Sequence, residues 1–462
     1  MPHQETLTVI AEVGHEQFCP LSQLLGRISD HLNSWTVVPF AKLHGVHFAR
    51  FILLDPTEDL DYVPVPAQLV LMTNVDAPLE GHIEELATIC GEGIDEVFAH
   101  CVGYPAPADR STTARRAFLQ EHMAKASAVH INRRGRSVEQ IRQEEILRYE
   151  INQYVDSSEL GSLAPEEIKQ RIIAFVRGRH DLNWALRPPE PPALAWRVKE
   201  WLHCFVGVLL LVLLLLVLFL FPLIAFPLLV LGVALFVLIL RYHEKRDKPD
   251  THAADPDKVR AFRNDEDFWI QNQIVATGFL KPGWFRQLTT AGILIVTDYF
   301  TRHIYNRGSL SGLNTIHFAR WVRMNGSRGL IFTSNYDGSL ESYMNDFIDK
   351  AAWGLNAIFT NGDGFPRTCF MFCGGIMDEK AYKRLLPTRQ APSNVWFSAY
   401  PHLTTKNIAN NEAIRLGLSQ SMDESQTRHW LRRFGCGNEL PEPTLIARLL
   451  DLIPWNRLCH CK

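Results

Sequence analysis

The sequence lacks the short motifs that mark the common enzyme classes. It contains no glycine-rich loop of the kind that holds phosphates, no helix with the paired histidines of zinc proteases, and no nucleophile elbow. The familiar hydrolase and nucleotide-binding classes therefore lose support. The chain also lacks an excess of one charge, because 47 basic and 50 acidic residues leave a net charge of -3. This balance does not favour nucleic acid, and we expect no nucleic-acid partner.

The cysteines do not form the regular pattern of a disulfide framework. Their count of nine is odd and they are scattered along the chain, which favours a reducing compartment. Cys369 and Cys373 stand four residues apart in a predicted strand, where buried thiols are a simpler interpretation than a metal site. Cys459-His460-Cys461 offers three soft ligands in a row. Three adjacent residues cannot all bind one ion with tetrahedral geometry, so we interpret this motif as part of a C-terminal tail without a metal site.

One stretch dominates the hydropathy of the chain. From Cys204 to Leu240 there is no charged residue, and nearly every side chain is apolar. As one helix with a rise of about 1.5 Å per residue it would be roughly 55 Å long, nearly twice the roughly 30 Å hydrocarbon core of a bilayer. Pro222 and Pro227 lie near its middle and would break a helix there. We therefore predict a transmembrane hairpin of two spans joined by a tight turn.

Basic residues at both ends of this run predict its orientation. They are Arg197 and Lys199 before it, and Arg241, Lys245, Arg246 and Lys248 after it. Basic flanks stay in the cytoplasm. The N-terminus also lacks the basic segment and apolar core of a secretory signal. The prediction is a multi-pass membrane protein with two spans, whose partner is the lipid bilayer and whose soluble parts both lie on the cytoplasmic side.

The segments on either side of the run repeat one pattern. The tetrapeptide His-Phe-Ala-Arg occurs at 47–50 and again at 317–320, and residues 69–86 match 330–347 without a gap. The recurring polar pairs are His47 with His317, Arg50 with Arg320, Asn74 with Asn335, and Asp76 with Asp337. A shared register of this length indicates an internal duplication.

A change of hydrophobic period within each copy predicts an α+β fold. Two short apolar stretches joined by a turn-rich link are typical of a hairpin, and the pattern becomes helical from Leu79 and from Leu340. Asp76 and Asp337 stand just ahead of these helices and are placed to cap them. Residues 367–375 predict a further strand. Strands on one face and helices on the other predict two tandem ferredoxin-like α/β sandwich repeats separated by a transmembrane helical hairpin.

The predicted domain order follows from these patterns. It comprises a first ferredoxin-like module (1–160), a helix and proline-rich linker (161–203), the transmembrane hairpin (204–240), a polar and loose linker (241–267), a second module (268–420) and a helical C-terminal tail (421–462). We expect the two modules to pack on each other as a pseudo-symmetric pair, with pairing between chains in a homo-oligomer as the alternative.

Two other segments have apolar faces. Phe285 to Asn306 is predicted to be a helix too short in its apolar part to span a bilayer, so it packs on the second module or lies on the membrane. Near the C-terminus, Leu445, Leu449, Leu450 and Ile453 share one helical face, which is typical of an interfacial helix.

The recurring polar residues are the candidate site. In a regular strand, residues three apart face opposite sides, so His47 and Arg50 reach one pocket only if a bulge intervenes. One interpretation is structural: each histidine is hydrogen-bonded in the core, each arginine bridges to a helix, and each aspartate is a helix cap. The alternative is a ligand-binding or catalytic role for the histidines and aspartates.

The stretches HFARW, SNYDGSLESYMNDFIDKAAWGLNAIFTNGDGFPRT and WFSAYP resemble an uncharacterised family of bacterial membrane-anchored proteins. This resemblance covers most of 268–418 and, more weakly, 43–148. The strand order distantly resembles the paired ferredoxin-like modules of dye-decolourising haem peroxidases. Their glycine-x-x-aspartate-glycine signature is altered at 334–338, where Ser334 replaces the first glycine. The resemblance implies a fold and leaves haem open as a cofactor, but it assigns no catalytic residue.

Two functions follow from these observations. The first is a membrane-anchored protein whose duplicated cytosolic modules bind a small molecule or a partner protein. The alternative is a membrane-tethered haem-dependent peroxidase-like or other redox enzyme, in which the recurring histidines, arginines and aspartates supply a ligand, a charge partner and an acid or base. We favour the binding function, because helix capping accounts for both aspartates and the peroxidase signature is altered.

Overall fold

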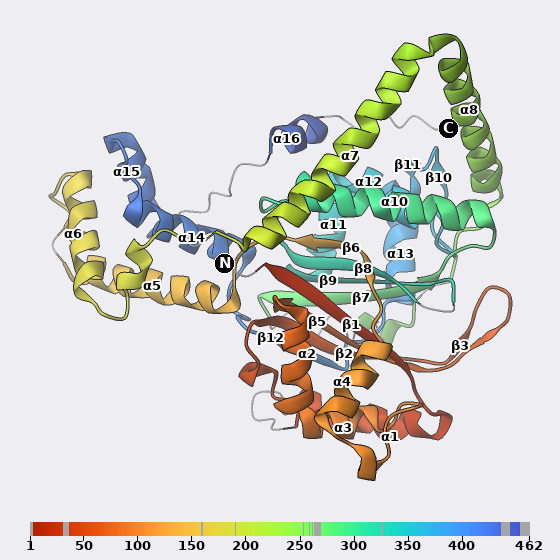
Figure 1. Ribbon diagram of the computed structural model, residues 1–462, viewed down its shortest axis with the longest axis horizontal. Helices are drawn as coiled ribbons and strands as arrows, with labels where there is room; N and C mark the ends of the chain where they lie inside the picture. Colours follow the sequence, from red (N-terminus) through yellow and green to blue (C-terminus); the bar gives the residue numbers. More distant parts are fainter. Residues whose placement is uncertain are drawn as a thin grey trace.

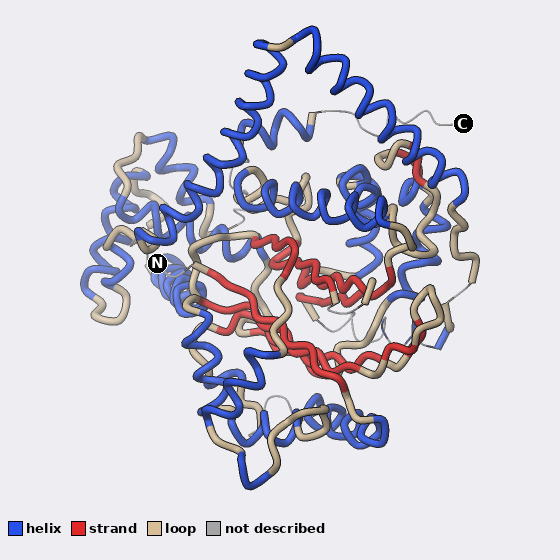
Figure 2. Tube along the Cα trace, turned by 45° about the vertical axis from the view of Figure 1, so that its right-hand side comes forward, coloured by secondary structure: helices blue, strands red, loops and turns tan. Residues whose placement is uncertain are grey.

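The computed structural model describes the chain except for residues 1–2, 31–36, 159, 190, 253, 258, 261, 263–268, 325–326, 436–443 and 453–462. Its centre is a pair of four-stranded antiparallel sheets, and helices cover the outer face of each sheet (Figures 1 and 2). The predicted α+β class is confirmed. The Cys459-His460-Cys461 motif and Ile453 lie outside the described residues.

Each sheet takes one edge strand from the other half of the chain. The first sheet has the order β1 (Gln4–Glu12), β5 (Gln68–Asp76), β2 (Val46–Leu54) and β12 (Val395–Ser398). The second has the order β7 (Gln271–Phe279), β9 (Gly329–Asp337), β8 (Ile316–Arg323) and β6 (Ala126–Ile131). Strand β12 comes from the C-terminal half and β6 from the N-terminal half. The expected modules 1–160 and 268–420 therefore interlock, and each contributes strands to both sheets.

Both faces of the central strands are buried, which explains their nearly continuous apolar sequence. Eight of the nine residues of β2 are buried. On the outer face, Phe51 packs with Phe98 in a core shared with the covering helices. On the inner face, Ile52 packs with Val322 of the second sheet. The two sheets therefore share a core where they face each other.

Helices are arranged in three groups around the sheets (Figure 1). The first sheet is covered by α1 (Phe18–Asp30), α2 (Leu79–Thr88), α3 (Gly91–Phe98) and α4 (Thr112–Glu121). The second is covered by α10 (Trp284–His303), α11 (Leu340–Lys350), α12 (Ala352–Phe359) and α13 (Glu379–Arg389). A lateral group contains α5 (Val138–Ser157), α6 (Pro165–Gly178), α14 (Thr405–Ser419) and α15 (Glu424–Arg432). The short helix α16 (Leu445–Asp451) lies near the base of the apolar hairpin. The helix predicted at 285–306 is confirmed by α10, which packs on the second sheet.

Two small hairpins complete the strands. They are β3 (Thr57–Glu58) with β4 (Pro64–Val65), and β10 (Thr368–Cys369) with β11 (Cys373–Gly374). The single strand predicted at 367–375 is wrong, because Phe370 and Met371 take φ values of 51° and 68° and turn the chain. Cys369 and Cys373 face each other across this turn and are disulfide-bonded, so the prediction of two buried thiols is also wrong.

The apolar run forms two helices, α7 (Leu194–Leu220) and α8 (Pro222–Arg246), each long and apolar enough to cross a membrane. They meet at Phe221 and splay apart toward the body of the protein (Figure 1). No residue of α7 is buried. Both helices extend beyond the predicted 204–240. The start of the expected loose linker is anchored, since Asp247 is paired with Lys281 at 2.8 Å and with Arg286 at 2.5 Å.

Candidate functional site

The two recurring histidines are held by the two recurring aspartates. His47 Nε2 lies 3.1 Å from Asp76 Oδ1, and His317 Nε2 lies 2.7 Å from Asp337 Oδ1. The other ring nitrogen of His47 is 2.8 Å from the Tyr400 hydroxyl. Both histidines are buried between the sheets. These contacts agree with the structural interpretation of the histidines as hydrogen-bonded core residues.

The aspartates do cap helices, but not the ones expected from the sequence. Asp76 Oδ2 accepts a hydrogen bond from the backbone amide of Val138, the first residue of α5, at 3.0 Å. Asp337 Oδ2 accepts one from the amide of Thr405, the first residue of α14, at 2.9 Å. The nearby helix α11 is capped by Ser339 instead. The prediction of local caps is wrong because each carboxylate accepts from the first amide of a helix that begins much later in the chain.

The two recurring arginines cross from one sheet to the other. Arg50 donates to the carbonyl of Ile274 at 3.2 Å and to the side chain of Asn335. Arg320 donates to the carbonyls of Leu7 at 2.6 Å and Thr73 at 2.7 Å. The expected bridge from each arginine to a helix is therefore wrong. Burial lowers the pKa of both guanidinium groups to about 9.

A bulge allows histidine and arginine to share one face. The pairing of β2 with β5 shifts between Val46 and Phe48, and that of β8 with β9 shifts between Ile316 and Phe318. The extra residue at each shift is the histidine, which turns toward the opposite sheet. His47 consequently packs 5.3 Å from the ring of Phe318. The sequence leaves a bulge open as one arrangement but does not locate it.

The recurring polar residues fill the space between the sheets rather than enclose a site. Asn335 accepts hydrogen bonds from Arg50 and from Trp396, and Asn74 is buried at the equivalent register position of the first sheet. The cavity beside His47 and His317 measures only about 20 Å³. Haem does not fit here, because there is no room for it and carboxylates already engage the histidine nitrogens.

Replacing Arg320 should test this structural role. We expect Arg320→Ala to lower the free energy of unfolding by about 3 kcal/mol, because it leaves a void and removes the donor from buried acceptors. Arg320→Met fills much of the space without a charge and should cost about 1 kcal/mol. Urea unfolding of the detergent-solubilised protein measures both values. An alanine variant within about 0.5 kcal/mol of the parent would contradict the structural role.

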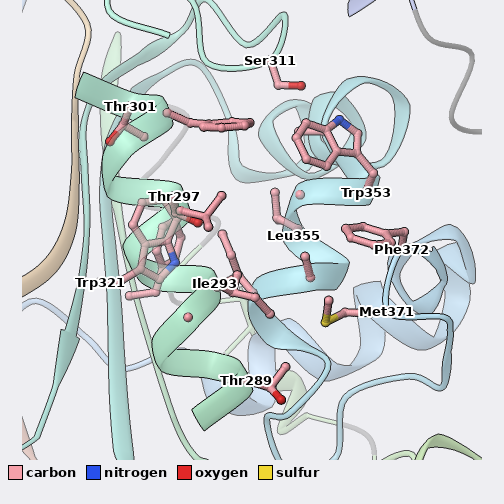
Figure 3. A pocket seen from close by; sticks show the side chains of 18 of the residues that line it. Thr289, Ile293, Thr297, Thr301, Ser311, Trp321, Trp353, Leu355, Met371 and Phe372 are labelled. Atoms are coloured by element: carbon pink, nitrogen blue, oxygen red, sulfur yellow. The ribbon is translucent and has the colours of Figure 1, made fainter. Parts of the chain in front are cut away.

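A much larger cavity lies on the opposite face of the second sheet. It has a volume of about 720 Å³ and is enclosed by α8, α10, α12, strands β8 and β9, and the β10–β11 turn (Figure 3). Ligand sites typically measure about 300–1,000 Å³. Its wall is almost entirely apolar, and among the described residues that line it none is charged. This cavity is the candidate functional site.

Helix α10 presents a regular face to the cavity. Thr289, Ile293, Thr297 and Thr301 line it at four-residue intervals, the spacing that places side chains on one side of a helix. Figure 3 shows these side chains on the helix that forms one wall. Elsewhere on α10, Leu294 is buried in the core of the second sheet and its covering helices, and Arg286 is buried against Asp247. Helix α10 therefore packs into the core of the second sheet with one face and lines the cavity with another.

The β10–β11 turn forms another part of the wall, and α8 holds it in place. Met371 and Phe372 in this turn line the cavity. The carboxylate of Glu244, near the end of α8, accepts hydrogen bonds from the backbone amides of Phe370 at 3.0 Å and Met371 at 2.7 Å. Glu244 is 2% exposed. The position of the turn is thus coupled to the position of the apolar helix α8.

The cavity opens beside α8. Several of its lining residues are exposed, among them Leu235 of α8 at 55%, and Leu288 and Trp284 of α10 at 63% and 70%. Residues deeper in the cavity, such as Trp321 and Ile358, are buried. The open side therefore faces the apolar hairpin rather than the sheet.

The sequence contained a partial signal for this site. Thr289, Thr297 and Thr301 fall on one helix face of α10 with Ile293, and the sequence predicts this segment as a helix that packs on the second module or lies on the membrane. What the sequence did not indicate is that α8, α12 and the turn at 370–372 meet this face. Comparison of the chain with known protein families, curated proteins and solved structures found no match. The peroxidase resemblance therefore stays a prediction.

Proposed function

We propose that this protein is a non-catalytic, membrane-anchored binding protein that takes a hydrophobic small molecule into the cavity between α8, α10, α12 and the second sheet. The observation that carries the proposal is the 720 Å³ apolar cavity, one wall of which is an apolar helix long enough to cross a membrane. Apolar surface of this extent gains free energy when a ligand replaces water. The recurring polar residues would then hold the sheets together.

The proposal includes a membrane hairpin and a duplicated body. The exposed apolar side chains of α7 and α8 support insertion into a bilayer, and the basic residues at both ends support a cytoplasmic body. The exposed Leu288 and Ile295 of α10 and Leu445 of α16, near the hairpin base, would rest on the lipid surface. Two tandem ferredoxin-like modules are supported by matching contacts, since Gln4 stands opposite Asp76 as Gln271 stands opposite Asp337.

Blocking the open side of the cavity should abolish binding. Gly292 of α10 lines the cavity and is exposed, and a Cβ built there meets open space, so Gly292→Phe would place a ring at the open side of the site without displacing backbone. The probe is a lipid with a photoactivatable diazirine in its chain, added to the protein in lipid nanodiscs. We expect labelling of α12, outside the proposed spans, to fall by about tenfold or more in Gly292→Phe, since a tenfold loss needs only about 1.4 kcal/mol.

Two controls accompany this measurement. Gly26 of α1 is exposed and also has open space at its Cβ, so Gly26→Phe makes the same substitution in a helix far from the cavity and should label as the parent does. Labelling of α7, which lies against surrounding lipid in this proposal, should be unchanged in both variants. If α12 is not labelled in the parent, or is labelled equally in Gly292→Phe, the proposal is wrong.

A further inference from the structure

The ring of Trp321 lines the cavity, and its buried hydrogen-bond donor has no acceptor among the described residues. Trp321 in β8 is 3% exposed, and its Nε1 has no hydrogen-bond partner among the described residues. Figure 3 shows the Trp321 ring projecting from the strand side of the cavity, with Trp353 on the α12 side. A buried donor without a partner is unfavourable. A ligand that brings an acceptor to this point would remove the penalty.

The other polar groups of the wall are neutral, and several are already engaged. The hydroxyl groups of Thr289 and Thr301 donate to carbonyls of their own helix, at Phe285 (2.7 Å) and Asp298 (3.1 Å). Among the described lining residues there is no lysine, arginine or histidine. A carboxylate, phosphate or sulfonate placed here would lose its water without meeting an opposite charge. The wall therefore disfavours charged lipids.

We infer that the ligand is a single-chain neutral lipid with a carbonyl or hydroxyl oxygen near one end, which enters sideways from the bilayer past α8 and accepts a hydrogen bond from Trp321. The inference rests on the proposed function and names the ligand class. A volume of about 720 Å³ suits one chain better than a two-chain phospholipid. The open side beside Leu235 and Leu288 lets the chain arrive from lipid without crossing water.

The test uses the full-length protein in nanodiscs and three diazirine probes of equal chain length. One is a monoacylglycerol, one an alkyl sulfonate, and one a hydrocarbon without an acceptor. The readout is the amount of each probe crosslinked to α12, normalised to its crosslinking on α7. We expect α12 labelling by the monoacylglycerol to exceed labelling by the sulfonate about tenfold, because the sulfonate loses its water without an opposite charge. It should exceed labelling by the hydrocarbon about fivefold, because the hydrocarbon lacks one hydrogen bond.

Trp321→Phe should remove the advantage of the monoacylglycerol over the hydrocarbon, while hydrocarbon labelling persists and reports an intact cavity. Trp353→Phe is the matched control on the α12 wall, and it should retain the higher labelling by the monoacylglycerol than by the hydrocarbon. Equal labelling by sulfonate and monoacylglycerol, or an unchanged preference in Trp321→Phe, would overturn the inference but leave cavity binding intact. Absence of α12 labelling by all three probes would overturn the proposed function as well.

Discussion

Expressed without the rest of the chain, residues 1–160 are expected not to form a stable monomeric domain. In the whole protein, β6 of this segment pairs with β8, and the edge of β2 pairs with β12. The isolated segment would keep neither partner. It would also expose the inner face of its sheet, where Ile52 and Met72 pack against the other half. Unpaired strand edges beside an apolar face favour aggregation or pairing between copies.

Analytical ultracentrifugation and urea unfolding of the purified segment measure this outcome. We expect aggregates or a strand-exchanged dimer, with no cooperative unfolding of a monomer. The control is co-expression with residues 161–462, which should return a stable complex in detergent because it restores both exchanged strands. A monomer of residues 1–160 that unfolds cooperatively would show that the strand exchange is dispensable.

Acid is expected to destabilise the protein as the pH falls below about 6.5, because two buried histidines resist protonation in the folded chain. Burial lowers the pKa of His82 to about 4, and burial together with Arg134 lowers that of His130 to about 3. An unfolded histidine takes up its proton near pH 6.5, so between pH 6.5 and 4 the unfolded chain binds more protons than the folded one. The stabilisation that each neutral buried histidine contributes is complete above about pH 6.5. Below that pH it falls by about 1.4 kcal/mol per pH unit for each histidine.

By pH 4 the two histidines together should remove about 6 kcal/mol, a large part of the roughly 5–15 kcal/mol that stabilises a typical protein. The chain itself offers non-titrating replacements. Tyr343 bonds Ser334 in the second half as His82 bonds Thr73 in the first. Likewise, Phe397 stands opposite Ala49 as His130 stands opposite Ala319.

The double variant His82→Tyr/His130→Phe should therefore lose about 6 kcal/mol less between pH 7 and pH 4 than the parent. Urea unfolding in detergent across this pH range measures the difference. His44→Gln is the control, because this exposed histidine pairs with Glu85 at the edge of the fold and its replacement should leave the pH profile nearly unchanged. If the free energy of unfolding falls equally with pH below 7 in the parent and the double variant, the prediction is wrong.

The sequence by itself determined the features that depend on neighbouring residues. The uncharged run and its prolines predicted two apolar helices, and α7 and α8 meet at Phe221, next to Pro222. Hydrophobic period and β-branched content predicted strands at HFAR and a helix at 285–306, because these signals repeat every two to four residues. The recurring polar residues also proved to be structurally equivalent between the halves, with the same hydrogen-bond partners in His47–Asp76 and His317–Asp337.

Only the tertiary structure decided which segments meet. A strand pattern predicts that β12 is extended, but its backbone groups can pair with any free strand edge. The edge that it uses belongs to β2, about 350 residues earlier in the chain. In the same way, Asp76 caps α5 rather than the next helix in the sequence, because the fold brings the first amide of α5 to its carboxylate. The cavity arises where α8, α10, α12 and a disulfide-bonded turn converge. No local pattern encodes that convergence, because it depends on how two interlocked sheets orient helices drawn from distant parts of the chain.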